Sequence, residues 1–275
     1  MEPQDLEFAV ELANKMDWNM TAQDFEFNMQ LEPEGCFILL DNAERTGLAT
    51  CVSYGEIGWF GNLVVEEGKR SRGAGANLVN HAAKYLRSKG VAAVGLYAYP
   101  YLEKFYDKLG FSRHDDFMVL KANAVQAPSI RDKNPKPITE KNLSLLADRD
   151  CNCFGACRKK LLKLLFENPA NIGYVAFEDS EVVGFAAAKV FGEAAEIGPL
   201  VCTRSRPDLA VNLLKAVLSR LCGLEAYIYL PVAETTLLDT AFELGFQKKF
   251  GLTRMFSGPA VAKTCIYSAE SLERG

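Results

Sequence analysis

The feature that most constrains the fold is an order of structural signals that occurs twice in the 275-residue chain. In the first half an apolar strand leads into Arg70-Ser71-Arg72, then an amphipathic helix, a strand and Leu109-Gly110-Phe111. In the second half Arg204-Ser205-Arg206 opens the same order, which ends at Leu244-Gly245-Phe246. Matched segments lie roughly half the chain apart, far more than the units of solenoid proteins. The repeat therefore indicates duplication of a whole domain.

The chain length suits two domains, and the boundary between them is marked by proline. Pro128, Pro135 and Pro137 lie among polar residues, a composition typical of a linker. We therefore expect a first domain at residues 1–125, a linker at 126–137 and a second domain at 138–275.

The first half predicts helices at its start and a three-stranded meander after them. Apolar runs at Cys36–Leu40, Gly47–Tyr54 and Ile57–Val65 are separated by turn residues, as in antiparallel strands. A helix follows, and Gly90 is placed to end it. With strands and helices mixed in both halves, the expected fold class is α+β, a mixed sheet flanked by helices.

The segment Arg70-Ser71-Arg72-Gly73-Ala74-Gly75 lies between a predicted strand and a predicted helix. The first N–H groups of a helix lack intrahelical partners and favour an anion, and two arginines add positive charge. The segment therefore suits a phosphate group, although its glycines could equally serve a tight turn. It lacks the Lys-Ser/Thr of a P-loop and the βαβ context of a dinucleotide site.

The R-x-x-G-x-G segment, followed by a helix, a strand and Phe105–Phe111, resembles the signature of GNAT acyltransferases. The resemblance implies two tandem GNAT-like acyl-CoA N-acyltransferase domains. It also implies that the amides of the loop hold the pyrophosphate of coenzyme A. These residues are Arg70, Ser71, Arg72, Gly73, Ala74 and Gly75.

In that family the strand before the loop carries a bulge and splays from its neighbour. Its backbone pairs with the pantetheine arm, a role that the resemblance transfers to Leu63, Val64 and Val65. Gly58 and Gly61 in this strand are compatible with a bulge or with simple packing.

The second half is similar to the C-terminal domain of YitH-like tandem acetyltransferases. The matching segments are Phe154–Arg158, Ile197–Leu200, Leu252–Phe256 and Ile266–Ser268. This resemblance refines the expected architecture more than the chemistry.

Acyl transfer from a thioester needs an aligned neutral amine, a donor to the oxyanion and a proton for the leaving thiolate. The resemblance gives the last role to Tyr106, which could otherwise be a core residue. The position where lysine-acetylating relatives often carry a glutamate base is Trp59, and Glu56 comes three residues early. The base therefore stays unassigned.

Three tyrosines, Tyr97, Tyr99 and Tyr101, cluster after the strand that precedes Tyr106. They suit the wall of an acceptor pocket, but they equally suit packing and an interface.

The second copy lacks the features that would bind coenzyme A. Pro207 and Leu209 replace the two glycines of the loop, and Ala241 replaces Tyr106. Proline has no N–H to donate, and leucine cannot adopt the conformations reserved for glycine. We therefore expect the second half either to wall the acceptor site or to stabilise the pair.

Net charge and cysteine usage limit the partners of the protein. A formal net charge of −4 gives no general attraction to nucleic acid or anionic membrane. The eight scattered cysteines suit reduced, buried thiols, and the start of the chain lacks a signal-peptide pattern, so we expect a cytoplasmic protein. Cys151, Cys153 and Cys157 lack the second pair of ligands that zinc sites use, so we expect no metal.

Together these features predict an N-acetyltransferase that moves acetyl from acetyl-CoA, as co-substrate, to a primary amine of a small molecule or peptide by direct attack. The alternative is a catalytically silent acyl-CoA-binding protein, which the absent carboxylate favours. An interaction scaffold would have no need of an intact Arg70–Gly75 loop. The oligomeric state stays open, with a homodimer as one option.

Overall fold

The protein is described from a computed structural model, which describes residues 1–129, 134–259, 261 and 264–275. Residues 130–133, part of the predicted linker, lie outside the described residues. The first half contains α1 (Leu6–Asn14), α2 (Ala22–Leu31), β1 (Cys36–Asp41), β2 (Glu44–Ser53), β3 (Ile57–Val65), α3 (Ala74–Ser88), β4 (Ala93–Ala98), α4 (Glu103–Asp107) and β5 (Ser112–Ala122).

The second half repeats this order of elements after a short edge strand. It contains β6 (Lys136–Pro137), α5 (Leu143–Phe154), α6 (Lys159–Glu167), β7 (Ile172–Glu178), β8 (Glu181–Phe191), β9 (Ala194–Thr203), α7 (Pro207–Leu218), β10 (Glu225–Pro231), α8 (Thr235–Glu243), β11 (Gln247–Ser257) and β12 (Cys265–Ser268). The last two residues of the predicted linker form β6, which pairs with β7.

Local signals in the sequence explain where the elements begin and end. Thr21 and Asp24 form a capping box at the start of α2, and the Thr21 N–H donates to Asp24 Oδ2 over 2.8 Å. Gly90, with φ of +87°, follows the last turn of α3 and ends it. On α3 the buried face carries Val79, Ala82 and Leu86 at helical spacing.

The described strands form one twelve-stranded sheet in which the halves exchange their last long strands. The order is β1-β2-β3-β4-β11-β5-β10-β9-β8-β7-β6, and β12 pairs with β9 off this path. Thus β11 of the second half lies beside β4, where Met255 pairs with Leu96. In return β5 lies beside β10, where Val119 pairs with Tyr229.

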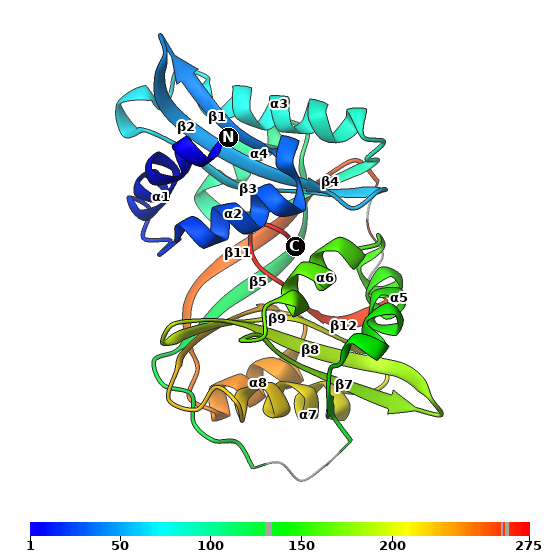
Figure 1. Cartoon of the computed structure of the whole chain (residues 1–275). Helices are drawn as coiled ribbons and strands as arrows, with labels where there is room; N and C mark the ends of the chain where they lie inside the picture. The colour runs from blue at the N-terminus through cyan, green and yellow to red at the C-terminus, as the bar shows by residue number, and fades with distance from the viewer. Residues whose placement is uncertain (130–133, 260, 262–263) are drawn as a thin grey trace.

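The exchange joins the two halves through backbone hydrogen bonds and a shared core. In Figure 1 the first half lies above the second, with β5 and β11 running between them. Helix α3 covers the outer face of the first half, whereas α7 and α8 cover that of the second (Figure 1). Between the halves Trp59, Phe154 and Phe256 pack in one buried cluster.

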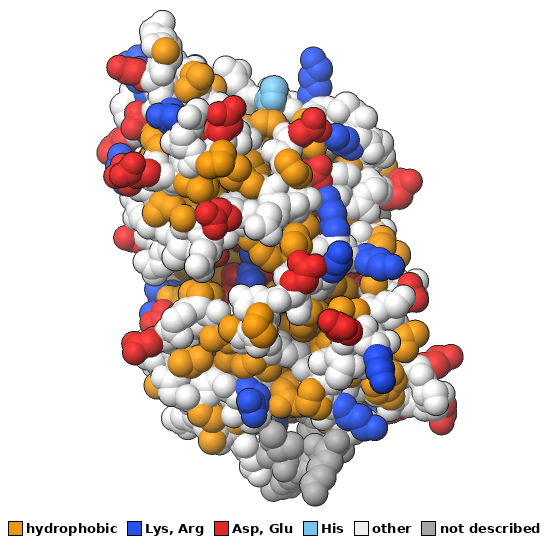
Figure 2. All heavy atoms as spheres, in the orientation of Figure 1, with side chains coloured by type: hydrophobic (Ala, Val, Ile, Leu, Met, Phe, Trp, Pro, Cys, Tyr) orange, Lys and Arg blue, Asp and Glu red, His pale blue; other side chains and the backbone are white. Residues whose placement is uncertain are grey.

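The predicted α+β class, a mixed sheet flanked by helices, is confirmed by these elements. Within the described part of the chain, no helix has the length and apolar character that crossing a membrane requires. Figure 2 shows apolar side chains spread over both halves of this face, interspersed with charged and polar ones.

Candidate functional site

Strand β3 bulges and then parts from β4. It pairs with β4 only from Ile57 to Trp59, in parallel register. Against β2 the register shifts between Thr50↔Gly61 and Leu48↔Val64, which inserts an extra residue into β3. Asn62 adopts φ of +51° in this bulge, and its Nδ2 donates to Thr50 Oγ1 over 3.1 Å. Beyond Trp59, β3 therefore has an edge that β4 does not pair.

The three residues expected to pair with pantetheine follow this bulge. Leu63 lines a hollow beside the strand, whereas Val64 and Val65 are buried, with 4% and 7% of their surface exposed. The carbonyl of Val65 accepts a hydrogen bond from Arg70 Nε over 2.8 Å. Gly61, one of the two glycines noted in this strand, is explained by close packing, because a Cβ there would lie 2.4 Å from Glu273 Cα.

The Arg70–Gly75 loop leads into α3 through Gly73, whose backbone has a left-handed conformation. Gly73 has φ of +86° and precedes the first residue of the helix. The first described hydrogen bond of the helix runs from Asn77 N to Gly73 O, 2.9 Å. The N–H groups of residues 74–76 come before it and therefore have no partner within the helix. A Cβ on Gly73 would meet open space, whereas one on Gly75 would lie 3.5 Å from Phe105. The start of α3 is thus free to receive an anion.

The two arginines of the loop differ in their contacts. Besides the Val65 carbonyl, Arg70 reaches Met16 Sδ over 3.5 Å, and Met16 lines the hollow. The hydrogen bond and charge of Lys69 lower the pKa of the Asp41 carboxyl, and Arg72 adds a smaller effect of the same sign. The side chain of Arg70 therefore reaches from the loop to Met16, a residue that lines the hollow.

The hollow has a volume of about 610 Å³ and is walled by both halves of the chain. The first half contributes the α1–α2 connection, the bulge of β3 and the segment from β4 to α4. The second half contributes residues of β8, β9, β10 and β11, with Leu272 and Glu273 after β12. The splayed strand therefore opens onto a space that neither half encloses alone.

Tyr106 lies on α4 with 5% of its surface exposed and lines this hollow. Its ring packs between Phe105 and Phe111, with centroids 5.0 and 5.9 Å away. Its hydroxyl makes no hydrogen bond to another described residue. Burial raises the pKa of Tyr106 above its usual range, so the phenol stays protonated and able to donate.

Tyr97, Tyr99 and Tyr101 all line the hollow as well. The Tyr99 and Tyr101 rings stack 5.4 Å apart, and Tyr101 is 71% exposed. Trp18, from the α1–α2 connection, donates its Nε1–H to the Tyr99 hydroxyl over 3.3 Å. These rings form an aromatic wall of the hollow.

Two carboxylates of the second half reach the hollow, which the sequence did not indicate. Trp59 is fully buried, and its Nε1–H donates to the Leu272 carbonyl over 3.2 Å. Glu196 on β9 and Glu273 line the hollow instead. No local motif marks either glutamate, because Glu196 lies on β9 of the degenerate second copy and Glu273 lies after β12.

The corresponding groove of the second half is filled by its own chain. Strand β12 pairs antiparallel with β9 from Leu200 to Thr203, the stretch that matches Val64 and the residues after it. At the start of α7, Pro207 occupies the first turn and Asp208 pairs with Arg206 over 2.9 Å. These contacts give a physical reason for the loss of the loop glycines in this half.

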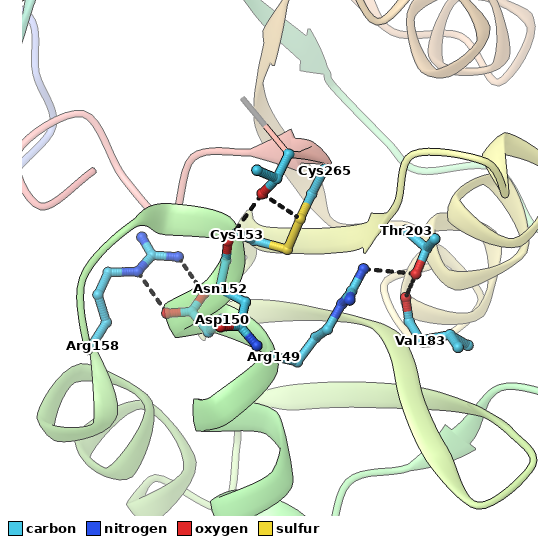
Figure 3. Close-up of a disulfide and its surroundings, with 9 residues drawn as sticks. Arg149, Asp150, Asn152, Cys153, Arg158, Val183, Thr203 and Cys265 are labelled. Atoms are coloured by element: carbon cyan, nitrogen blue, oxygen red, sulfur yellow. Dashed lines mark hydrogen bonds and ion pairs between the residues drawn. A yellow bond between two sulfur atoms is a disulfide. The ribbon is translucent and has the colours of Figure 1, made fainter. Parts of the chain in front are cut away.

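The expectation that the cysteines are reduced is wrong for one pair. Cys153 on α5 and Cys265 on β12 form a disulfide, with Cα atoms 5.4 Å apart (Figure 3). The bond tethers β12 to α5, a contact between segments 112 residues apart that the sequence alone could not place. Cys151 and Cys157 remain free thiols, and the described residues contain no cluster that could hold a metal ion.

Comparisons with known proteins agree with this geometry. The profile described as "Acetyltransferase (GNAT) family" matches residues 5–111, and the one described as "Acetyltransferase (GNAT) domain" matches residues 146–267. The chain therefore belongs to the GNAT acetyltransferases and carries two GNAT domains in tandem, as predicted. The finer kinship with YitH-like proteins stays a prediction.

Solved structures share the fold at low sequence identity. A candidate acetyltransferase from Pyrococcus horikoshii superposes with a TM-score of 0.83 at 20% identity, covering 100% of this chain and 94% of that one. A GCN5-related N-acetyltransferase from Sphaerobacter thermophilus gives 0.67 at 13% identity, covering 96% of each chain. A tandem GNAT protein from the clavulanic acid biosynthesis pathway gives 0.65 at 12%, covering 94% and 97%. No curated protein sequence matches the chain significantly.

Proposed function

We propose that the protein is an N-acetyltransferase that transfers acetyl from acetyl-CoA to a primary amine, at one site in the first half. The observation that carries this proposal is the contrast between the two copies. In the first, the splayed edge of β3 and the start of α3 are open, and in the second, β12 and Pro207 block their counterparts.

In this proposal the pyrophosphate of the coenzyme binds the N–H groups at the start of α3, around Gly73 and Ala74, beside Arg70, Ser71, Arg72 and Gly75. The pantetheine arm lies along Leu63, Val64 and Val65, which places the thioester at the bulge. A backbone N–H of the splayed strand then donates to the developing oxyanion.

The chemistry needs one bond made and one broken. The neutral amine attacks the thioester carbon, a C–N bond forms, and collapse of the tetrahedral adduct breaks the C–S bond. Tyr106 gives the leaving thiolate a proton and regains one from solvent, which takes up the proton that the amine loses. The second candidate, a silent acyl-CoA-binding protein, is favoured by Trp59, which stands where a carboxylate base would be.

The test is release of free thiol from acetyl-CoA, scanned over polyamines, amino acids, aminoglycosides and peptide N-termini. Tyr106→Phe is expected to lower kcat about 100-fold, near the lower end for general acids, because a thiolate is already a good leaving group. Its Kd for acetyl-CoA should change less than about threefold, since the phenyl ring keeps its packing.

Tyr174→Phe is the matched control, because Tyr174 lies on β7 of the second half and outside the hollow. An unchanged kcat in Tyr106→Phe would remove Tyr106 from the mechanism. Acetyl-CoA binding without thiol release on any amine would favour the silent binding protein.

A further inference from the structure

A buried group of charges lies where the second half meets the hollow. It consists of Lys189 on β8, Glu196 on β9, and Glu270, Glu273 and Arg274 after β12, and we call it the charge cluster. Their side chains are between 0% and 14% exposed. Buried charges are costly unless oppositely charged groups compensate them.

The cations of the charge cluster act mainly on one carboxylate. Glu270 accepts from Arg274 Nε over 2.9 Å and from Lys189 Nζ over 2.8 Å. Arg274 Nη1 also contacts Glu273 Oε1 over 2.6 Å, and Lys189 also contacts Glu196. Three carboxylates thus share two cations, which leaves one negative charge in excess.

The two carboxylates that share the excess charge are the ones that line the hollow. Glu196 accepts a hydrogen bond from the Tyr229 hydroxyl. Burial raises the pKa of Glu196, and Lys189 opposes the change. Glu273 Oε2 has no hydrogen-bond partner within the described part of the chain.

The rest of the lining also suits a cation. Its charged described residues are Asp17, Asp24, Glu196 and Glu273 against Lys249. Trp18, Tyr99 and Phe250 offer ring faces, and the Tyr99 and Phe250 centroids lie 5.4 Å apart. Aromatic faces attract ammonium groups through the electrostatics of the ring.

Glu273 lies beside the bulge of β3, where the proposed function places the thioester. Its backbone lies against Gly61, where a Cβ would be 2.4 Å from Glu273 Cα, and Gly61 directly precedes the bulge at Asn62. A cation held by Glu273 is therefore close to the thioester site of the proposed function.

We propose that the acceptor is a linear amine with a second, non-reacting ammonium group, which binds between Glu196 and Glu273 while the reacting nitrogen lies at the Asn62–Leu63 bulge. The inference rests on the proposed function for the identity of the reacting nitrogen. The excess charge in the hollow is independent of it.

The test compares 1,5-diaminopentane with 1-aminopentane, which has the same carbon chain and lacks the second ammonium. Wild type should show a kcat/KM about 10- to 100-fold higher for the diamine, the range expected of one hydrogen bond to a charged group. Glu196→Gln keeps a partner for the Tyr229 hydroxyl and should raise the KM for the diamine by a similar factor. The KM for 1-aminopentane should change less than about threefold in that variant.

Two further variants control for charge. Glu243→Gln removes a carboxylate at the exposed end of α8, outside the hollow, and should change neither KM. Lys249→Gln removes the cation of the lining, so it should lower the KM for the diamine about two- to fivefold, an effect of opposite sign.

Calorimetric titration of 1,5-diaminopentane into wild type with coenzyme A present gives a readout that does not need turnover. Binding of the diamine that Glu196→Gln weakens supports the proposal even if no acetyl transfer is found. Equal turnover or equal binding of the two amines would overturn the proposal and leave the proposed function intact. Failure of acetyl-CoA to bind would instead overturn the proposed function. The calorimetric titration of the diamine would still test the second ammonium site in that case.

Discussion

Gly73→Asp is expected to weaken acetyl-CoA binding by about 100-fold or more, because it places a carboxylate where the pyrophosphate should bind. Gly73 has φ of +86° at the start of α3, and its missing side chain leaves open space. Aspartate tolerates left-handed backbone better than most residues, so the loop should keep its conformation. The measurement is the Kd of acetyl-CoA by isothermal titration calorimetry.

The other end of the same helix offers a matched control. Gly90 has φ of +87°, and a Cβ there also meets open space. Gly90→Asp therefore carries the same backbone strain and the same added charge, but far from the start of α3. Its melting temperature should fall at least as much as that of Gly73→Asp, because a carboxylate at the C-terminal end of a helix opposes the helix dipole. Its Kd for acetyl-CoA should stay at the wild-type value. Equal Kd values in both variants would show that the start of α3 is not the coenzyme site.

The sequence predicted the elements of the first half because their signals are local. Thr21 and Asp24 mark the start of α2, and Gly90 marks the end of α3. Each signal acts within one or two turns of the chain, where propensity and capping determine the conformation. The repeat extended the same interpretation to the second half.

The exchange of β5 and β11 could not be predicted in the same way. Both strands follow a Leu-Gly-Phe turn after an equivalent short helix, at Leu109–Phe111 and Leu244–Phe246. Either strand could satisfy the hydrogen bonds of β4 or of β10, since both are long and apolar on the buried face. The choice depends on packing between the halves, which no local pattern records.

The candidate site was predictable where it depends on backbone and unpredictable where it depends on distant side chains. The loop around Gly73 and the role proposed for Tyr106 follow from motifs. Glu196 and Glu273 follow from none, because the first lies in a degenerate copy and the second lies after β12. Trp59 did indicate that β3 lacks the carboxylate that relatives use as a base, and the hollow has Glu196 and Glu273 from the second half beside Asp17 and Asp24 of the first.

Asp150→Ala is expected to lower the free energy of unfolding by about 3–5 kcal/mol, because it leaves a buried guanidinium without its counter-ion. Asp150 and Arg158 are both 0% exposed, and their two hydrogen bonds measure 2.7 and 2.9 Å (Figure 3). The cost of burial would lower the pKa of Arg158, but Asp150 outweighs it and holds that pKa above its usual range. Denaturant unfolding measures the change.

The control for this prediction is Asp148→Ala, since Asp148 is exposed on the same helix and its loss should change stability by less than about 0.5 kcal/mol. Replacing both partners, in Asp150→Ala with Arg158→Met, should cost less than Asp150→Ala alone, because no unpaired charge then remains. A loss below about 1 kcal/mol in Asp150→Ala would mean that Arg158 finds water or another partner.

Arg158 also donates to the Gly275 carbonyl over 2.5 Å. Asp150→Ala should therefore also loosen the segment that carries Glu273 and raise the KM for a diamine, which links the stability of the buried pair to the shape of the acceptor site.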